Sequence, residues 1–156
     1  MPTADGWINV FRLTASDPVS SPDADLRAVE SLFGGSGPEA WLTHTVDDAL
    51  EAMNQTGIDR ALLTVRGLPG DGPRSSASLL SVEGGVAACR MAADRFRLVL
   101  HLQDVASPRA AACLVREHAA LDEVVAVGVF PSYLGVDLHD RRLYPVYEAC
   151  IEMGVP

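Results

Sequence analysis

The chain has 156 residues, of which 48% are hydrophobic and 21% charged, a composition typical of one globular domain. Its net charge of -9 argues against nucleic acid or an anionic membrane as partner, because phosphate binding requires clustered Lys and Arg. No apolar run approaches the roughly 20 residues that cross a bilayer, and the N-terminus lacks the basic and apolar regions of a secretory signal. We therefore expect a cytoplasmic protein.

The cysteines of the chain support the same compartment. Cys89, Cys113 and Cys150 are odd in number, widely spaced and form no Cys-x-x-Cys pair. Each stands in an apolar helical context. This pattern favours buried free thiols in a reducing environment over a disulfide framework or a metal site.

The first part of the chain predicts a strand, a long loop and a helix. The apolar run Gly6–Leu13 suits a first strand, whereas residues 14–44 are rich in Ser, Pro, Asp and Gly and predict a loop insertion. Thr45 is placed to cap a following helix through its hydroxyl group, and Gly57 is placed to end that helix.

The remainder alternates strands and helices. The predicted strands are Asp59–Val65, Phe96–Leu102 and Glu123–Phe130, and the predicted helices are Ser78–Ala93, Ser107–Ala120 and Asp140–Met153. The pair Gly84 and Gly85 weakens its helix by roughly 1 kcal/mol per glycine, so close packing or a kink is expected there. The alternation predicts an α/β fold with parallel strands. Four such units make either a small open sheet or half of an eight-stranded barrel, which needs about 250 residues.

Three segments then resemble a known family. "MNQTGIDRALLT" (53–64), "ADRFRLVLHL" (93–102) and "GVFPSYLGVDLHDRRLYPVYEACIEMGVP" (128–156) follow the order and spacing of the amidohydrolase-related family. This branch of metal-dependent (β/α)8 enzymes includes aminocarboxymuconate-semialdehyde decarboxylase and γ-resorcylate decarboxylase. The resemblance covers about residues 46–156. It implies that the chain is a single partial domain, 1–156, holding the first four βα units of a TIM barrel.

The same resemblance implies a divalent metal, zinc, whose ligands are not present in this chain. Family members carry a His-x-His pair at the end of the first strand, where this sequence has Phe11 and Leu13, and neither side chain can bind a metal. Later family ligands belong to strands five to eight, which lie beyond this sequence. The four histidines share no short ligand spacing, and neither a G-x-S-x-G elbow nor a phosphate-binding glycine loop is present.

Polar residues at the strand ends are the candidate site, because barrel enzymes place their active sites at the carboxyl ends of the strands. His101 and Asp104 are predicted to be catalytic. The predicted substrate-binding residues are Arg12, His44, Arg66, Ser132 and Tyr133. The arginines could clamp a carboxylate through paired hydrogen bonds. The competing interpretation is that strand ends are polar simply because they meet solvent.

Two functions remain open. The chain is expected to be a component or fragment of an amidohydrolase-related enzyme, a hydrolase or decarboxylase-type lyase acting on a small carboxylated molecule. Segment 140–156 predicts a fourth barrel helix followed by the start of another strand, so a second half or partner chain is expected. The alternative is a non-catalytic binding or scaffold subunit that has lost the metal site. Both predict oligomers, since a half barrel exposes strand edges and apolar faces.

Overall fold

Four parallel strands form one sheet in the computed structural model, which describes residues 4–8, 12–14, 16, 45–66, 80–102 and 105–156. Their order in the sheet is the order of the chain. The strands are β1 (Ala4–Ile8), β2 (Arg60–Arg66), β3 (Phe96–Leu102) and β4 (Val124–Val129). This sequential parallel order confirms the predicted α/β fold.

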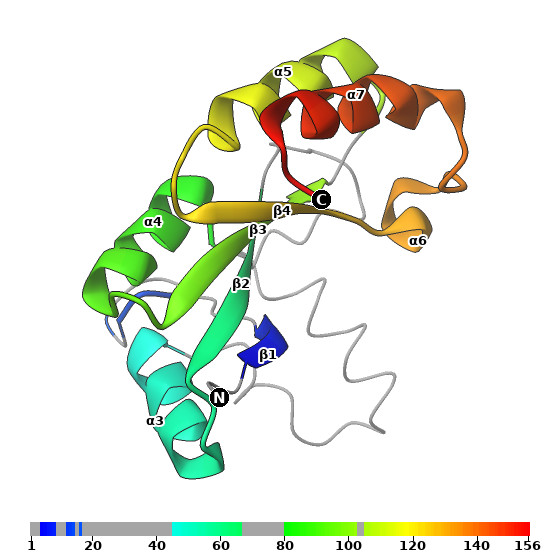
Figure 1. Cartoon of the computed structure of the whole chain (residues 1–156). Helices are drawn as coiled ribbons and strands as arrows, with labels where there is room; N and C mark the ends of the chain where they lie inside the picture. Colours follow the sequence, from blue (N-terminus) through cyan, green and yellow to red (C-terminus); the bar gives the residue numbers. More distant parts are fainter. Residues whose placement is uncertain (1–3, 9–11, 15, 17–44, 67–79, 103–104) are drawn as a thin grey trace.

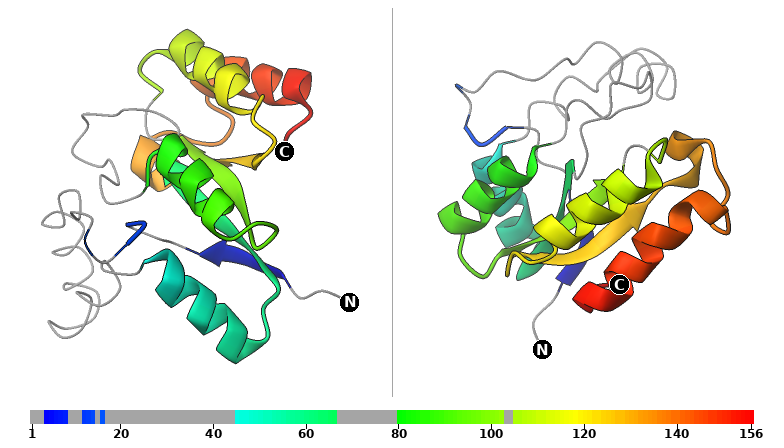
Figure 2. Two further views of the ribbon diagram at one scale, coloured as in Figure 1. Left: turned by 90° about the vertical axis from the view of Figure 1, so that its left-hand side faces the viewer. Right: turned by 90° about the horizontal axis from the view of Figure 1, so that it is seen from above.

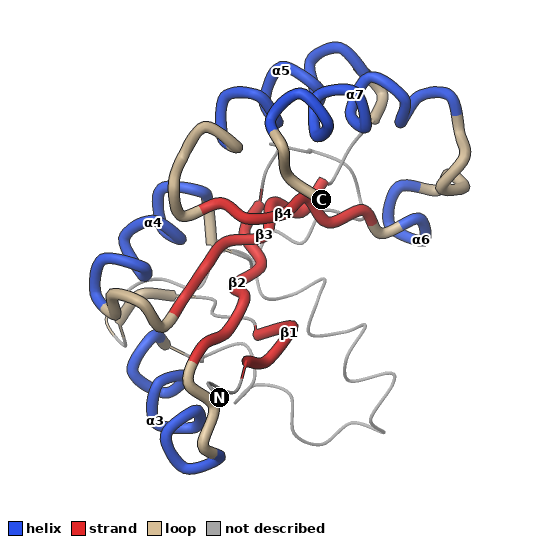
Figure 3. Tube along the Cα trace, in the orientation of Figure 1, coloured by secondary structure: helices blue, strands red, loops and turns tan. Residues whose placement is uncertain are grey.

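Helices connect the strands and lie along one face of the sheet (Figures 1 and 2). Figure 3 shows the same alternation of helix and strand along the trace. The helices are α3 (Val46–Thr56), α4 (Val82–Met91), α5 (Pro108–His118), the short α6 (Pro131–Leu134) and α7 (Tyr144–Met153), with a 3-10 turn η1 (Arg141–Leu143) before the last. We call this side of the sheet the helix-covered face and the other side the opposite face.

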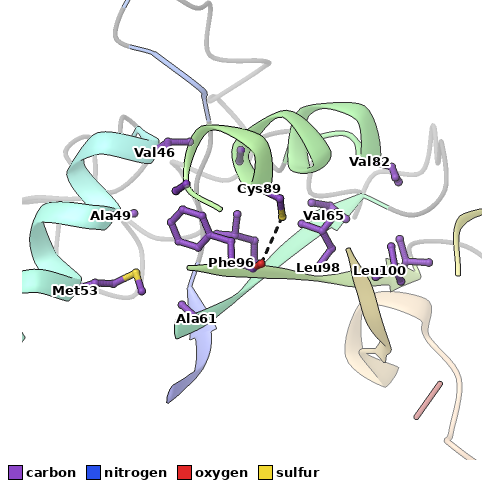
Figure 4. Close-up of a cluster of buried hydrophobic side chains, with 14 residues drawn as sticks. Val46, Ala49, Met53, Ala61, Val65, Val82, Cys89, Phe96, Leu98 and Leu100 are labelled. Atoms are coloured by element: carbon purple, nitrogen blue, oxygen red, sulfur yellow. Dashed lines mark hydrogen bonds between the residues drawn. The ribbon is translucent and has the colours of Figure 1, made fainter. Parts of the chain in front are cut away.

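The core fills the helix-covered face in two clusters. Alternate residues of β2 and β3 project into the first cluster, where α3 and α4 pack on them (Figure 4). Phe96 and Leu98 lie at its centre, both fully buried. The second cluster joins α5 and α7 to the end of β3, through Leu102, Val115 and Val146. Burial of these apolar side chains is the main term that stabilises the sheet.

Gly85 allows α4 to approach the sheet closely. A Cβ atom at this position would lie 2.5 Å from Cγ1 of Val65 and 3.0 Å from Cδ2 of Leu98. Real Cβ atoms do not come that near a buried branched side chain, so alanine would push the helix away. The close packing predicted for the glycine pair is confirmed.

Helix ends follow the sequence in most places. Thr45 and Asp48 form a reciprocal capping box, and Gly57 and Gly154 end α3 and α7 in the left-handed conformation, as predicted. Ser107 occupies the N-cap position of α5, but its side chain makes no capping hydrogen bond.

Several boundaries differ from the prediction. The first strand is Ala4–Ile8, residues 9–11 of the predicted span Gly6–Leu13 lie outside the described residues, and residues 12–13 are not in a strand. The second helix begins at Val82 and not at Ser78, because Ser81 still pairs with Arg66 of β2 as a strand residue does. The last helix begins as the 3-10 turn, with Asp140 as its cap. The helix α6 was not predicted, and four residues are too short to show a period.

The cysteines correct one expectation. All three are free, as predicted, and Cys89 is buried, with its thiol 3.7 Å from the carbonyl oxygen of Phe96 (Figure 4). Cys113, however, is exposed, because its position on α5 faces away from the sheet. Within the described residues, no helix is long and apolar enough to cross a membrane. Residues 17–44 lie outside the described part, so the long loop predicted at 14–44 stays a prediction.

Candidate functional site

A layer of four residues lies across the carboxyl ends of three strands. Arg66 of β2 is the register partner of His101 of β3, and His101 is the partner of Gly128 of β4. Phe130 follows β4 directly. Side chains alternate along a strand, so these residues project from the opposite face while their neighbours Val65 and Leu100 join the helix-covered core. We call Arg66, His101, Gly128 and Phe130 the strand-end layer.

His101 is the buried member of this layer. It is 3% exposed, and its ring meets the ring of Phe130 edge to face, with centroids 4.4 Å apart and planes at 76°. Burial disfavours the imidazolium ion and lowers the pKa of His101 to about 4. The competing interpretation, that strand ends are polar because they meet solvent, does not apply to this residue. At neutral pH the layer holds a neutral, desolvated imidazole.

Gly128 leaves space for this arrangement. A Cβ atom there would lie 3.3 Å from Cγ1 of Val99 and 3.5 Å from Cε2 of Phe130. The first of these distances is tighter than ordinary contact, so any larger residue would displace Val99 or the phenyl ring. Glycine thus lets Phe130 settle over the histidine.

Arg66 provides the charge. Its backbone N–H donates to the carbonyl oxygen of Leu80 at 2.8 Å, which fixes the end of β2 beside α4. Its side chain is half-buried, and no ion pair or hydrogen bond of the guanidinium is found in the described part of the chain. A guanidinium in this setting presents parallel donors to a carboxylate. The layer therefore combines an anion-binding group, a neutral imidazole and an aromatic face.

The remaining predicted residues are only partly placed. Arg12 is half-buried outside any strand, beside Leu13, which packs against the first core cluster. His44 and Asp104 lie outside the described residues. Ser132 and Tyr133 belong to α6, and their side chains likewise lie outside the described part. Of the predicted set, the structure brings together Arg66 and His101.

Sequence reasoning missed the other two members of the layer. Gly128 and Phe130 are apolar, so a search for polar strand ends passes over them. The available signal was strand parity. Gly128 pairs with His101, and Phe130 comes two residues later, so both point to the same face of the sheet as His101. Counting register from His101 would have placed the phenyl ring next to the imidazole.

The described residues do not form a metal centre. No group of three or more His, Cys, Asp or Glu side chains that could hold an ion occurs among them. Leu13, at a position where the resemblance calls for a ligand, contributes to the core instead. The donor set on this part of the chain therefore does not fit a divalent metal.

Comparison with known proteins shows the fold. No protein-family model matches the chain, and no curated protein matches its sequence. Two solved structures are similar, both of 5-carboxyvanillate decarboxylase from Novosphingobium aromaticivorans with bound manganese and a hydroxy-methoxy-nitrobenzoic acid. One matches with a TM-score of 0.56 at 15% identity over 97% of this chain and 53% of the other. A variant of the enzyme matches with 0.59 at 17% identity over 100% and 52%.

The chain thus spans about half the length of these neighbours, which are TIM-barrel decarboxylases. At this level of identity the likeness establishes the architecture and not the activity. The four parallel βα units correspond to half of such a barrel, which confirms the fold class expected from the sequence.

Proposed function

We propose that this chain provides half of an amidohydrolase-related barrel enzyme that acts on a small carboxylated molecule, as a decarboxylase-type lyase or a hydrolase. The main support is the strand-end layer at the carboxyl ends of parallel strands. There Arg66, whose guanidinium has no partner among the described residues, stands beside buried His101. Active sites of barrels form at this edge. Both structural neighbours hold a benzoic acid, which supports an aromatic carboxylate as the substrate class.

The layer has a clear division of roles. The guanidinium of Arg66 would donate paired hydrogen bonds to a carboxylate, and the face of Phe130 would limit the position of an aromatic ring. His101 is neutral above its pKa of about 4. It can donate a hydrogen bond from one ring nitrogen and accept one at the other, and so orient a hydroxyl or carboxyl group without adding charge. We assign no step to a metal, because the described residues do not hold one.

We also propose that a second protein chain, a copy of this one or a paralogue, completes the site. In the sheet order β1-β2-β3-β4, β1 is an edge strand. At the β4 edge the chain's own C-terminus already pairs, because the N–H of Val127 donates to the carbonyl oxygen of Pro156 at 2.9 Å. Next to this edge, α7 exposes Ile151, whose side chain is 79% exposed, and Tyr144. Unpaired strand edges and apolar helix faces are surfaces on which proteins associate.

The second candidate function is a non-catalytic binding or scaffold subunit. Leu13, where the family resemblance calls for a metal ligand, is partly buried and packs against the core, which favours this alternative. Such a subunit would bind the carboxylate through the same layer without changing it.

Binding can be tested by titrating the protein with 5-carboxyvanillate and following its amide NMR signals. The Arg66→Gln substitution should weaken binding at least about tenfold, as expected for loss of a charge-assisted hydrogen bond. Arg90→Gln is the matched control, because Arg90 is exposed on the outer side of α4. Equal binding by wild type and Arg66→Gln would exclude the layer as the carboxylate site.

Catalysis is tested separately by CO2 release from bound 5-carboxyvanillate. The enzyme proposal predicts release by the assembled protein and loss of that release in Arg66→Gln. Saturating binding without any release, in every assembly formed with a partner, would favour the scaffold alternative. The mass of the assembly by light scattering reports whether a second chain is present, and a stable monomer that turns over substrate would exclude the partner proposal.

A further inference from the structure

A surface pocket lies away from the strand-end layer, between the beginnings of α5 and α7. These helices run side by side with their N-terminal ends at the same end of the molecule (Figures 1 and 2). The pocket has a volume of about 480 Å³. Its apolar walls include Ala106, Pro108 and Pro145, and its polar side chains include Arg109, Arg141 and Arg142. We call it the arginine pocket.

The charge around this pocket is opposite to that of the chain. The chain carries 12 Lys and Arg residues against 21 Asp and Glu, yet three of the basic residues line one pocket. Arg142 is neutralised by Asp140, which accepts hydrogen bonds from its Nε at 3.1 Å and its Nη2 at 2.9 Å. Arg109 and Arg141 are exposed, and within the described residues neither makes an ion pair or a side-chain hydrogen bond. Among the residues that the structure describes, no carboxylate pairs with these two positive charges.

This arrangement opposes the stability of α5. Carboxylates favour the first turn of a helix and cations disfavour it, because the helix dipole is positive there. Neither α5 nor α7 has an acidic residue in its first turn, and Arg109 stands in the first turn of α5. A bound anion would relieve the repulsion among these groups.

We propose that the arginine pocket binds a small organic acid, with its carboxylate between Arg109 and Arg141 and its apolar body against Pro108 and Pro145. Guanidinium groups bind carboxylates through paired donors, and the proline rings provide apolar contact for a ring or short chain. This site is separate from the one in the proposed function. It lies beside α5 and α7, which pack on the helix-covered face, whereas His101 projects from the opposite face.

The probes for this site are sodium benzoate, neutral benzamide and inorganic phosphate, each titrated into the full chain while amide NMR signals are followed. Benzoate is expected to shift the amide signals of residues 107, 109, 110 and 141–144 saturably, and benzamide is not, because only benzoate carries the charge. Phosphate is expected to bind more weakly than benzoate, because it makes no use of the proline walls.

Variants separate this site from the strand-end layer. The double substitution Arg109→Gln with Arg141→Gln should weaken benzoate binding here at least about fivefold, while Arg66→Gln leaves it unchanged and Arg90→Gln serves as the neutral control. If the double variant does not fold, the comparison of benzoate with benzamide on the unaltered chain decides the question.

Three results would overturn the proposal. These are equal shifts with benzamide, tighter binding of phosphate than of benzoate, or undiminished binding in the folded double variant. If the strand-end layer is not a binding site, Arg66→Gln will instead leave the binding of 5-carboxyvanillate unchanged. The two proposals can therefore be contradicted independently.

Discussion

The two faces of the sheet differ in what they contribute. On the helix-covered face, β2 and β3 present fully buried side chains such as Leu63 and Leu98 to α3 and α4. On the opposite face, the same strands carry the half-buried Leu62 and Val99 and, at their carboxyl ends, Arg66 and His101. The helix-covered face packs apolar side chains along its whole length. The opposite face carries, at the carboxyl ends of its strands, groups that can bind and orient a ligand.

This difference follows from the two-residue period of a strand. Because neighbouring side chains point to opposite faces, one run of residues can stabilise the fold and build a site at once. His101 stands between Leu100 and Leu102, and both leucines are buried on the helix side. The buried leucines on either side therefore hold the imidazole in place, while the imidazole itself is not part of the helix-covered core.

Truncation of a leucine on each face gives the largest expected contrast. Leu98→Ala should lower the free energy of unfolding by about 2–5 kcal/mol, because it leaves a cavity under α4. Leu62→Ala removes the same atoms from the half-buried opposite face and should cost less than half as much. Urea denaturation of both variants measures the two values. Equal losses would mean that the faces do not differ in packing.

Alanine substitutions at the two adjacent glycines of α4 should change the stability of the protein in opposite directions. Gly85→Ala should destabilise the protein by about 1–3 kcal/mol, because the new Cβ would lie 2.5 Å from Val65. Gly84→Ala meets only ordinary contacts with Leu80 at 3.5 Å, and should stabilise the helix by up to about 1 kcal/mol. Thermal unfolding of the two variants checks the prediction, and two changes of the same sign would contradict it.

His101 on the opposite face should make the stability of the protein depend on pH. The folded pKa of His101, about 4, lies below the ordinary value of 6.5, so the unfolded chain binds a proton that the folded chain excludes. Stability from this group is complete above pH 6.5 and falls as the pH drops toward 4. Between pH 7 and pH 5 the loss should be roughly 2 kcal/mol.

His101→Gln removes this contribution. The difference between the wild-type and variant unfolding free energies, measured at several pH values, isolates it from the other titrating groups. A difference that does not change between pH 7 and pH 5 would show that His101 is not buried as a neutral group.

Much of the fold is predictable from the sequence, because its signals are local. The helix starting after Thr45 has a capping box, and the strand Phe96–Leu102 appears with the predicted bounds. The errors occur where a partner decides the boundary. Helix α4 begins only at Val82, because Ser81 pairs with Arg66 of β2.

The candidate site is predictable only in its polar part. Arg66 and His101 stand at strand ends, so their location follows from the order of strands. The burial of His101 depends on Phe130, which comes from the next strand and reaches it through the register between β3 and β4. Register is a tertiary property, so strand parity identifies the ring that covers the imidazole only once the pairing of β4 with β3 is known.

The most direct test of the strand-end layer is the pKa of His101 itself, measured by NMR of the labelled imidazole and assigned with the His101→Gln variant. A neutral, desolvated imidazole under Phe130 predicts a pKa of about 4, with no protonation between pH 7 and pH 5.5. A His101 signal that titrates near 6.5 would contradict the buried layer, and with it the site proposed for carboxylated ligands.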